Sequence, residues 1–196
     1  MIVEILIGAG IVAAGAAAAR VITRRRAANA ERARAPEVPE APRGPRGLRV
    51  GDVLLYADSE LWLAGCVELD EEGLVARVFP TPGSPRAEFV VQLDPEARDL
   101  VVARACDEVP DGPVPESLPI GGRRLALERR GHAAARAEGE HLPRTTERAS
   151  YTILSDVGGR VLVVADFVNG RRLALVGDRV SEHMVDLLPG GDLESR

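Results

Sequence analysis

The chain has 196 residues, of which 45% are apolar and only 3% aromatic, and its formal net charge is −5. Residues 1–46 hold eight Arg against four Glu, whereas residues 47–196 hold 17 Arg against 26 Asp and Glu. Because the larger part carries a strong excess of negative charge, it is repelled by nucleic acid and by anionic lipid, which excludes it as a nucleic-acid-binding domain.

Residues 1–26 are predicted to form a transmembrane anchor. An uncharged run extends from Ile5 to Ala19. By itself this run is too short for a hydrocarbon core of about 30 Å, but the segment from Ile2 to Thr23 covers about 33 Å as a helix. An all-apolar run of this kind has no amphipathic stripe, so it does not match a buried helix of a globular domain.

The arginines that follow the apolar run predict how the anchor is oriented. Arginine clusters favour the cytoplasmic side of a membrane, whereas a cleaved signal peptide carries its positive charges before the apolar run. We therefore expect a single-pass anchor whose C-terminal side faces the cytoplasm. Its flanking residues are Arg20, Arg24, Arg25 and Arg26.

Residues 27–46 are predicted to be a linker. They show no apolar periodicity, and proline recurs at every third position, at Pro36, Pro39, Pro42 and Pro45. This spacing matches one turn of polyproline II, which is typical of a semi-extended spacer. A ligand for an aromatic-groove domain has a similar pattern, but a spacer is the commoner meaning.

Residues 47–191 are predicted to form a mainly β domain, with residues 192–196 as a tail. Apolar and polar residues alternate in short segments that Asp, Gly and Pro separate, which is typical of strands. Gly158-Gly159 and Asn169-Gly170 indicate tight hairpin turns. The expected strands are 52–56, 61–69, 74–79, 88–93, 99–103, 124–128, 132–138, 151–154, 160–167, 171–176 and 184–188.

The strands fall into two series that open in a similar way. Leu48-Arg49-Val50-Gly51 opens the first series, and Leu118-Pro119-Ile120-Gly121 opens the second series 70 residues later. This spacing suggests a duplication. We expect two similar β-halves, residues 47–109 and 117–190, which form sheets or a partly open barrel.

Four short motifs are spread over residues 47–188: Leu48-x-x-Gly51-Asp52-x-Leu54-x-Tyr56, Trp62 to Gly65, Glu138-Gly139-Glu140 and Tyr151. Together they resemble a bacterial family catalogued as domain-of-unknown-function family 4178. The resemblance implies the β-rich fold and the N-terminal anchor, and places the chain in a bacterial inner (plasma) membrane. The family has no established activity, so no chemistry is implied. The chain departs from the family in having few aromatic residues at 75–79 and 89–93.

The best candidates for metal ligands are four residues within ten positions, His132, Glu138, Glu140 and His141. On a strand, Glu138 and Glu140 share a face while His141 points away, so the set does not converge unless the chain turns after Gly139. We therefore predict neither a metal site nor another cofactor, and interpret these residues as a polar strand end.

Other residues that could carry chemistry have simpler interpretations. Cys66 and Cys106 are too few for a zinc site or a disulfide framework, so we expect free thiols that are buried or half-buried. No Gly-x-Ser-x-Gly nucleophile turn is present, and Ser84 has no base nearby in sequence. Trp62 could be a ligand platform, but a core aromatic on a central strand is the commoner case.

These observations predict a non-enzymatic adaptor, or interaction module, that displays a β-domain at the cytosolic face of the membrane. Its expected partner is another protein, which is itself in the membrane if tethering is to raise the local concentration of both. The alternative is a small-molecule sensor or an enzyme whose pocket lies between the two β-halves. No catalytic residue is predicted.

Overall fold

The computed structural model describes residues 47–93, 99–168 and 171–190. Almost all regular structure within these ranges is β-strand, which confirms the prediction of a mainly β domain. The predicted anchor (1–26), linker (27–46) and tail (192–196) lie outside the described residues. Within those residues, no helix has the length and apolar character needed to cross a membrane.

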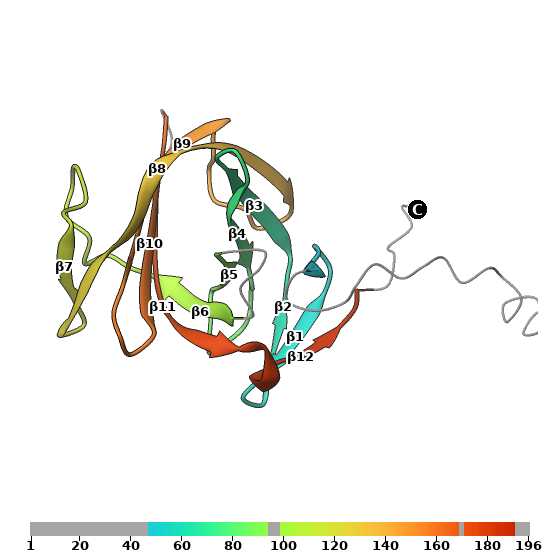
Figure 1. Ribbon diagram of the computed structural model, residues 1–196. Helices are drawn as coiled ribbons and strands as arrows, with labels where there is room; N and C mark the ends of the chain where they lie inside the picture. The colour runs from blue at the N-terminus through green and yellow to red at the C-terminus, as the bar shows by residue number, and fades with distance from the viewer. Residues whose placement is uncertain (1–46, 94–98, 169–170, 191–196) are drawn as a thin grey trace, which may run out of the picture. The chain divides into compact units, whose positions relative to one another are not determined.

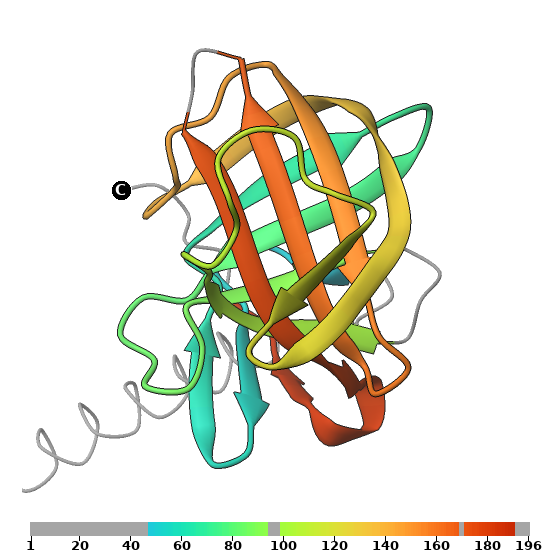
Figure 2. The ribbon, with the colours of Figure 1, turned by 90° about the vertical axis from the view of Figure 1, so that its left-hand side faces the viewer.

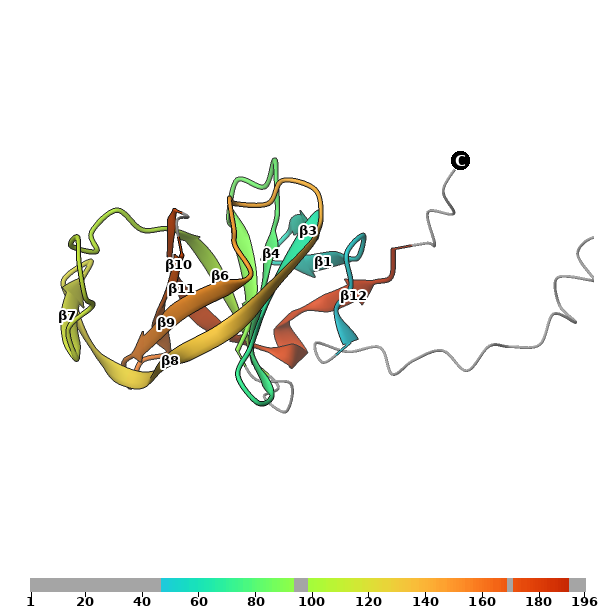
Figure 3. The same cartoon turned by 90° about the horizontal axis from the view of Figure 1, so that it is seen from above.

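Eight strands close into an antiparallel barrel (Figures 1 and 3). The ring consists of two meanders of four strands each. It is closed by two seams, where β6 pairs with β11 and β3 pairs with β8. The barrel is thus closed rather than partly open. Its strands are β3 (Gly65–Asp70), β4 (Leu74–Pro80), β5 (Phe89–Gln92), β6 (Asp99–Ala105), β8 (Arg123–Gly139), β9 (Arg148–Ser155), β10 (Arg160–Phe167) and β11 (Arg172–Ser181).

The barrel interior is filled by side chains. Every second residue of each strand points inward, and all eight strands contribute to one buried apolar cluster. Small residues such as Ala133 and Ala135 on β8 leave room for the larger Tyr151 and Phe167 on β9 and β10. The interior is therefore a packed core.

A separate three-stranded sheet packs on the outside of the first meander (Figure 1). Its strands, in the order β12-β1-β2, are β12 (Asp186–Leu188), β1 (Val53–Tyr56) and β2 (Ser59–Trp62). We call it the small sheet. The buried carboxylate of Asp52 accepts hydrogen bonds from the N–H groups of Arg49 (2.8 Å) and Gly190 (2.9 Å), so it joins the two ends of the domain.

The other side of the barrel is covered by β7 (Ser117–Ile120) and the segment before it, which cross the outer face of the second meander (Figure 2). Apolar residues of this cover, including Val114 and Leu118, pack on Leu154 and Leu162. The cover has a topological reason. Because β6 and β8 run in the same direction, the chain must return along the barrel before β8 can begin, and β7 makes this return.

The strand boundaries correct four expectations. Residues 61–69 belong to two strands of different sheets, β2 and β3. The expected strands at 124–128 and 132–138 are one strand, β8, which shifts register between Leu127 and Arg129. Residues 184–188 hold the end of a 3-10 helix (Glu182–Met184) before β12 begins. Strand β7 is absent from the expected strands, because the sequence predicts residues 118–121 as the opening of the second series, whereas Pro119 lies in an edge strand.

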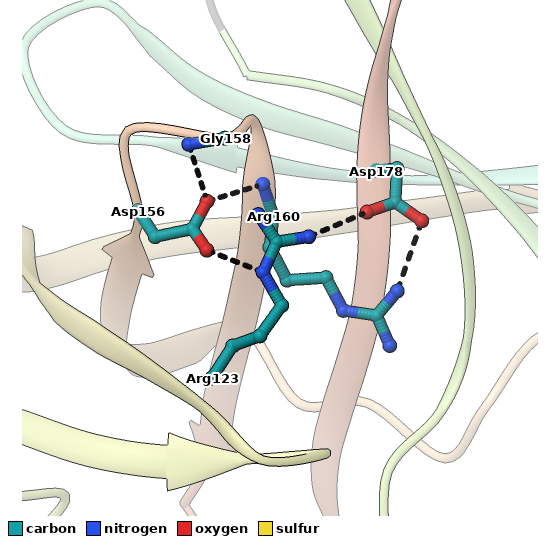
Figure 4. Close-up of polar contacts among 5 residues, drawn as sticks. All are labelled: Arg123, Asp156, Gly158, Arg160 and Asp178. Carbon is teal, nitrogen blue, oxygen red and sulfur yellow. Dashed lines mark hydrogen bonds and ion pairs between the residues drawn. The ribbon is translucent and has the colours of Figure 1, made fainter.

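A tight turn joins β9 to β10, as Gly158-Gly159 predicts (Figure 4). The carboxylate of Asp156 accepts hydrogen bonds from the N–H groups of Gly158 and Arg160, both at 2.9 Å. It also forms an ion pair with the guanidinium of Arg123 at 2.7 Å. Partial burial opposes its charge, but these donors outweigh burial and lower the pKa of Asp156. The other predicted turn, Asn169-Gly170, lies outside the described residues.

One end of the barrel is held together by Glu71, in the turn between β3 and β4. Its carboxylate accepts hydrogen bonds from the Tyr151 hydroxyl (2.5 Å) and the His132 N–H (3.2 Å). The guanidinium of Arg129 lies 3.6 Å from the same carboxylate and over the Tyr151 ring. We call this group the Glu71 tether, because it joins the first meander to β8 and β9.

Gln92, at the end of β5, carries an uncompensated burial cost. Its side chain is 0% exposed, and neither polar atom has a hydrogen-bond partner among the described residues. We expect Gln92→Leu to raise the free energy of unfolding by about 1 kcal/mol, because an unpaired buried amide is removed and the side-chain volume is nearly kept. Thermal unfolding by circular dichroism measures this, and a lower melting temperature would show that the amide has a partner.

Candidate functional site

The four candidate metal ligands lie in different surroundings. His132 meets the Glu71 tether through its N–H, Glu138 pairs with Cys66 across the β3–β8 seam, and the N–H of Glu140 bonds the carbonyl of Ala64 at 2.8 Å. His141 packs edge-on against Trp62, with ring centroids 6.3 Å apart. Within the described ranges, no His, Cys, Asp and Glu residues form a group able to hold a metal ion.

Trp62 is not in the core, which corrects the prediction for this residue. It lies on β2, an outer strand of the small sheet, and its side chain is 40% exposed. Val53 of β1 pairs directly with Trp62 on one side and with Leu188 of β12 on the other. Directly paired residues point to the same face, so these three apolar side chains form a row. Leu188 is 49% exposed.

A second row lies beside the first on the same face of the small sheet. Leu55 pairs with Glu60 and with Asp186, and both acidic side chains are exposed. The opposite face carries Leu54 and Leu61, which pack on the barrel. We call the outward side the Trp62 face. It consists of Val53, Leu55, Glu60, Trp62, Asp186 and Leu188.

The small sheet has two edge strands, β2 and β12, and among the described residues no strand pairs with the outer edge of β2, which we call its open edge. Leu63 exchanges backbone hydrogen bonds with Gly51 and Asp52, on the β1 side. Main-chain groups alternate in direction along an antiparallel strand, so the N–H and C=O groups of Glu60 and Trp62 point away from β1. A closed barrel has no edges, and the edge strand β7 contains Pro119, which has no N–H to donate.

Comparison with known protein families, curated proteins and solved structures finds no match for the chain. The resemblance drawn from its motifs therefore stays a prediction.

A groove of about 650 Å³ lies on the outer wall of the barrel, where β4, β3 and β8 meet. Charged side chains line it, among them Glu68, which pairs with Arg77 at 2.8 Å. Cys66 also lines this groove. Burial, with a smaller contribution from the Glu138 carboxylate, raises the pKa of Cys66 to about 12. Its thiol therefore stays protonated at neutral pH and is a poor nucleophile.

A second groove, of about 620 Å³, lies where β10 ends and β9 begins. Three of its residues, His132, Ser150 and Asp166, are direct partners across β8, β9 and β10. The serine stands between the other two, whereas a nucleophilic triad needs the imidazole between hydroxyl and carboxylate. In addition, Asp166 is bound by Arg172 at 2.6 Å. The row does not have the order that serine catalysis requires.

Two features of the site are not evident from local sequence patterns. The juxtaposition of His132 and Ser150 depends on the pairing of β8 with β9, which no local pattern reveals. The exposure of Trp62 depends on β2 being the outer strand of a hairpin whose turn is formed by Ala57 and Asp58. Of these two, only Asp58 is a typical turn residue, so the sequence signal is weak. Both turn residues have positive φ, at 47° and 60°, which marks a tight hairpin.

Proposed function

We propose that this chain is a non-enzymatic adaptor, held by its N-terminal segment at the cytosolic face of a bacterial inner membrane, and that it binds a protein partner through the Trp62 face. The observation that carries the proposal is an apolar row, Trp62–Val53–Leu188, whose two outer members are exposed, next to the open edge of β2. Tryptophan is among the residues that supply most of the binding energy at many protein interfaces, where its side chain becomes buried on binding.

The chemistry of the described residues supports an adaptor over an enzyme. The barrel interior is occupied by its apolar cluster, so it has no room for a substrate. The groove on the outer wall crosses the β3–β8 seam between the two meanders, and two of its charged side chains, Glu68 and Arg77, already pair with each other. The thiol of Cys66 is protonated at neutral pH, and the Ser150 row has the wrong order for a triad. Tethering to the membrane raises the concentration of a binding module near other membrane proteins, which suits an adaptor of modest affinity.

The first test concerns orientation. With Arg24, Arg25 and Arg26 on the C-terminal side of the apolar run, a fluorescent protein that folds only in the cytoplasm should fluoresce when it is fused after Arg196. A phosphatase that is active only in the periplasm should be inactive at the same position. The reverse pattern would show that the domain is outside the cytoplasm.

The second test concerns the Trp62 face. The full-length chain, extracted in mild detergent, should retain a specific membrane-protein partner, and Trp62→Ser should reduce its recovery at least tenfold. Val157→Ser is the matched control, because Val157 is fully exposed in the β9–β10 turn and lies outside the Trp62 face. Quantitative mass spectrometry of the co-purified proteins gives the measurement.

Two outcomes would contradict the adaptor. If Trp62→Ser and Val157→Ser retain the same proteins as the unmodified chain, then the Trp62 face is not the binding site. If no protein is retained and a small metabolite raises the melting temperature of the chain, then the chain is a ligand-binding protein.

A further inference from the structure

The Trp62 face also indicates what its partner is made of, and this step rests on the proposed function. We infer that the partner segment is an extended stretch of alternating basic and apolar residues from the cytosolic flank of a membrane protein, and that it adds to the open edge of β2 as a fourth strand of the small sheet.

The three strands of the small sheet carry acidic side chains and no basic ones, and the nearest Arg in the sequence, Arg49, precedes β1. Residues 50–76 and 180–190, which include all three strands of the small sheet, contain no Arg, and the chain contains no Lys. Exposed Glu60 and Asp186 flank the apolar row, and exposed Asp58 lies in the turn that leads into β2. An acidic surface of this kind attracts basic segments and repels acidic ones.

The geometry of β2 specifies an extended partner. The N–H and C=O groups of Glu60 and Trp62 point toward the open edge, so an added strand can form a hydrogen-bonded ladder there. Side chains of the added strand alternate between the two faces of the sheet. The residues beside Trp62 and beside Glu60 lie two positions apart on one face, so in an alternating segment both of them are basic. One stacks on the Trp62 ring and the other pairs with the Glu60 carboxylate, while the apolar residues of the segment lie on the opposite face, beside Leu61.

The source of such a segment follows from how membrane proteins are charged. Cytosolic loops of membrane proteins carry an excess of Lys and Arg near their membrane ends. An adaptor held close to the bilayer by a short linker meets these flanks before any other basic segment. The lipid surface itself is disfavoured as the ligand, because the headgroups of anionic lipids are repelled by Glu60 and Asp186.

The sole tryptophan of the chain is Trp62, so its fluorescence reports on this face alone. The test uses the full-length chain in nanodiscs of phosphatidylcholine. A blocked peptide of alternating Arg and Val should shift the Trp62 emission to shorter wavelength in a saturable way. Binding should weaken at least tenfold between about 0.05 M and 0.5 M salt, because the attraction between exposed charges is screened. A peptide of alternating Glu and Val should give no shift.

Two variants with the same change in net charge locate the attraction. Glu60→Arg combined with Asp186→Arg should weaken binding of the Arg–Val peptide at least tenfold. Asp107→Arg combined with Glu116→Arg changes two exposed acids outside the small sheet, and should weaken binding less than twofold. An Arg–Val peptide with N-methylated backbone at alternate positions should also lose binding, because it cannot complete a strand ladder.

The inference is overturned if the Arg–Val peptide does not bind or if both double variants weaken its binding equally. It is overturned as well if the N-methylated peptide binds as tightly as the unmodified one. It is also overturned if phosphatidylglycerol nanodiscs alone shift the emission, which would identify the bilayer as the ligand. These failures are distinct from failure of the adaptor proposal. In each of them, if Trp62→Ser still abolishes recovery of the co-purified partner, the proposed adaptor function remains supported, and the partner has a different chemistry.

Discussion

Replacing Gly177 with alanine should lower the free energy of unfolding by about 3 kcal/mol, and the melting temperature by about 10 °C. Gly177 lies on β11, at the seam where the second meander pairs with β6 of the first. A Cβ atom at this position would overlap the carbonyl oxygen of Val102 and would lie 2.8 Å from the Cα of Ala103. Both are backbone atoms of β6, so the two strands must move apart.

Gly158→Ala is the matched control for this change. A Cβ atom on Gly158 also meets another group, but that group is the end of the flexible Arg123 side chain, which can move away. The cost is then limited to a partly exposed ion pair, and we expect less than about 1 kcal/mol. Thermal unfolding of both variants in parallel makes the comparison. Equal stability of Gly177→Ala and the unmodified chain would mean that the seam is not so closely packed.

Removing the Tyr151 hydroxyl should cost about 1–2 kcal/mol in the variant Tyr151→Phe, because the hydroxyl donates to a carboxylate at 2.5 Å while its ring stays packed in the barrel. Denaturant unfolding near neutral pH provides the measurement. Tyr56→Phe is the matched control. Tyr56 is only half-buried and packs against the cluster beneath the small sheet, so Tyr56→Phe should lower the free energy of unfolding by less. Equal decreases in the two variants would show that the hydrogen bond from Tyr151 to Glu71 does not contribute to stability.

The same tether predicts how stability depends on pH. Hydrogen bonds from the Tyr151 hydroxyl and the His132 N–H lower the pKa of Glu71 below its ordinary value of 4.5. The resulting stability is present above pH 4.5 and is lost as the pH falls toward the lowered pKa of the folded state. Glu71→Gln should remove this part of the acid dependence. An unchanged acid limb in Glu71→Gln would contradict the assignment.

At alkaline pH, the same group makes stability fall as the pH rises. Burial, followed by the hydrogen bond to Glu71, raises the pKa of Tyr151 above its ordinary value of 10.0. The folded state therefore favours the protonated hydroxyl, and its contribution is full below pH 10 and is lost as the pH rises through the raised pKa. Tyr151→Phe should remove this loss, which unfolding curves measured above pH 10 would detect.

Local patterns predicted the fold class and most of the strands, because strand and turn preferences act over a few residues. The alternation in 160–167 and the Gly158-Gly159 pair correspond to β10 and its turn. The two seams could not be predicted in this way. Pairing of β3 with β8 joins residues about 70 positions apart, and no property of either segment alone specifies its partner. The long strand β8 was divided for the same reason, since its polar centre is explained by pairing with β9.

The sequence predicts less of the candidate site than of the fold. Trp62 looked like a core residue because it lies between Leu61 and Leu63, but alternation on β2 buries those two neighbours and exposes the tryptophan. The prediction treated 61–69 as one central strand, which placed Trp62 in the wrong environment. His141 was considered as a metal ligand, and its actual neighbour is the Trp62 ring. The acidic character of the face, by contrast, is visible in the absence of Arg from residues 50–76.

The small sheet is built from the two ends of the domain, and this has a consequence for synthesis on the ribosome. Strands β1 and β2 emerge early, whereas β12 begins at Asp186, and the bond from Gly190 to Asp52 spans 138 positions. A chain that ends after β11 still contains all eight barrel strands, but β12 is missing from beside β1, so that only the β1–β2 hairpin of the small sheet remains. Two-stranded sheets are marginal in water. The Trp62 row, which needs Leu188, is therefore finished last, so that an incompletely translated chain should fail to engage a partner and only finished copies should recruit one.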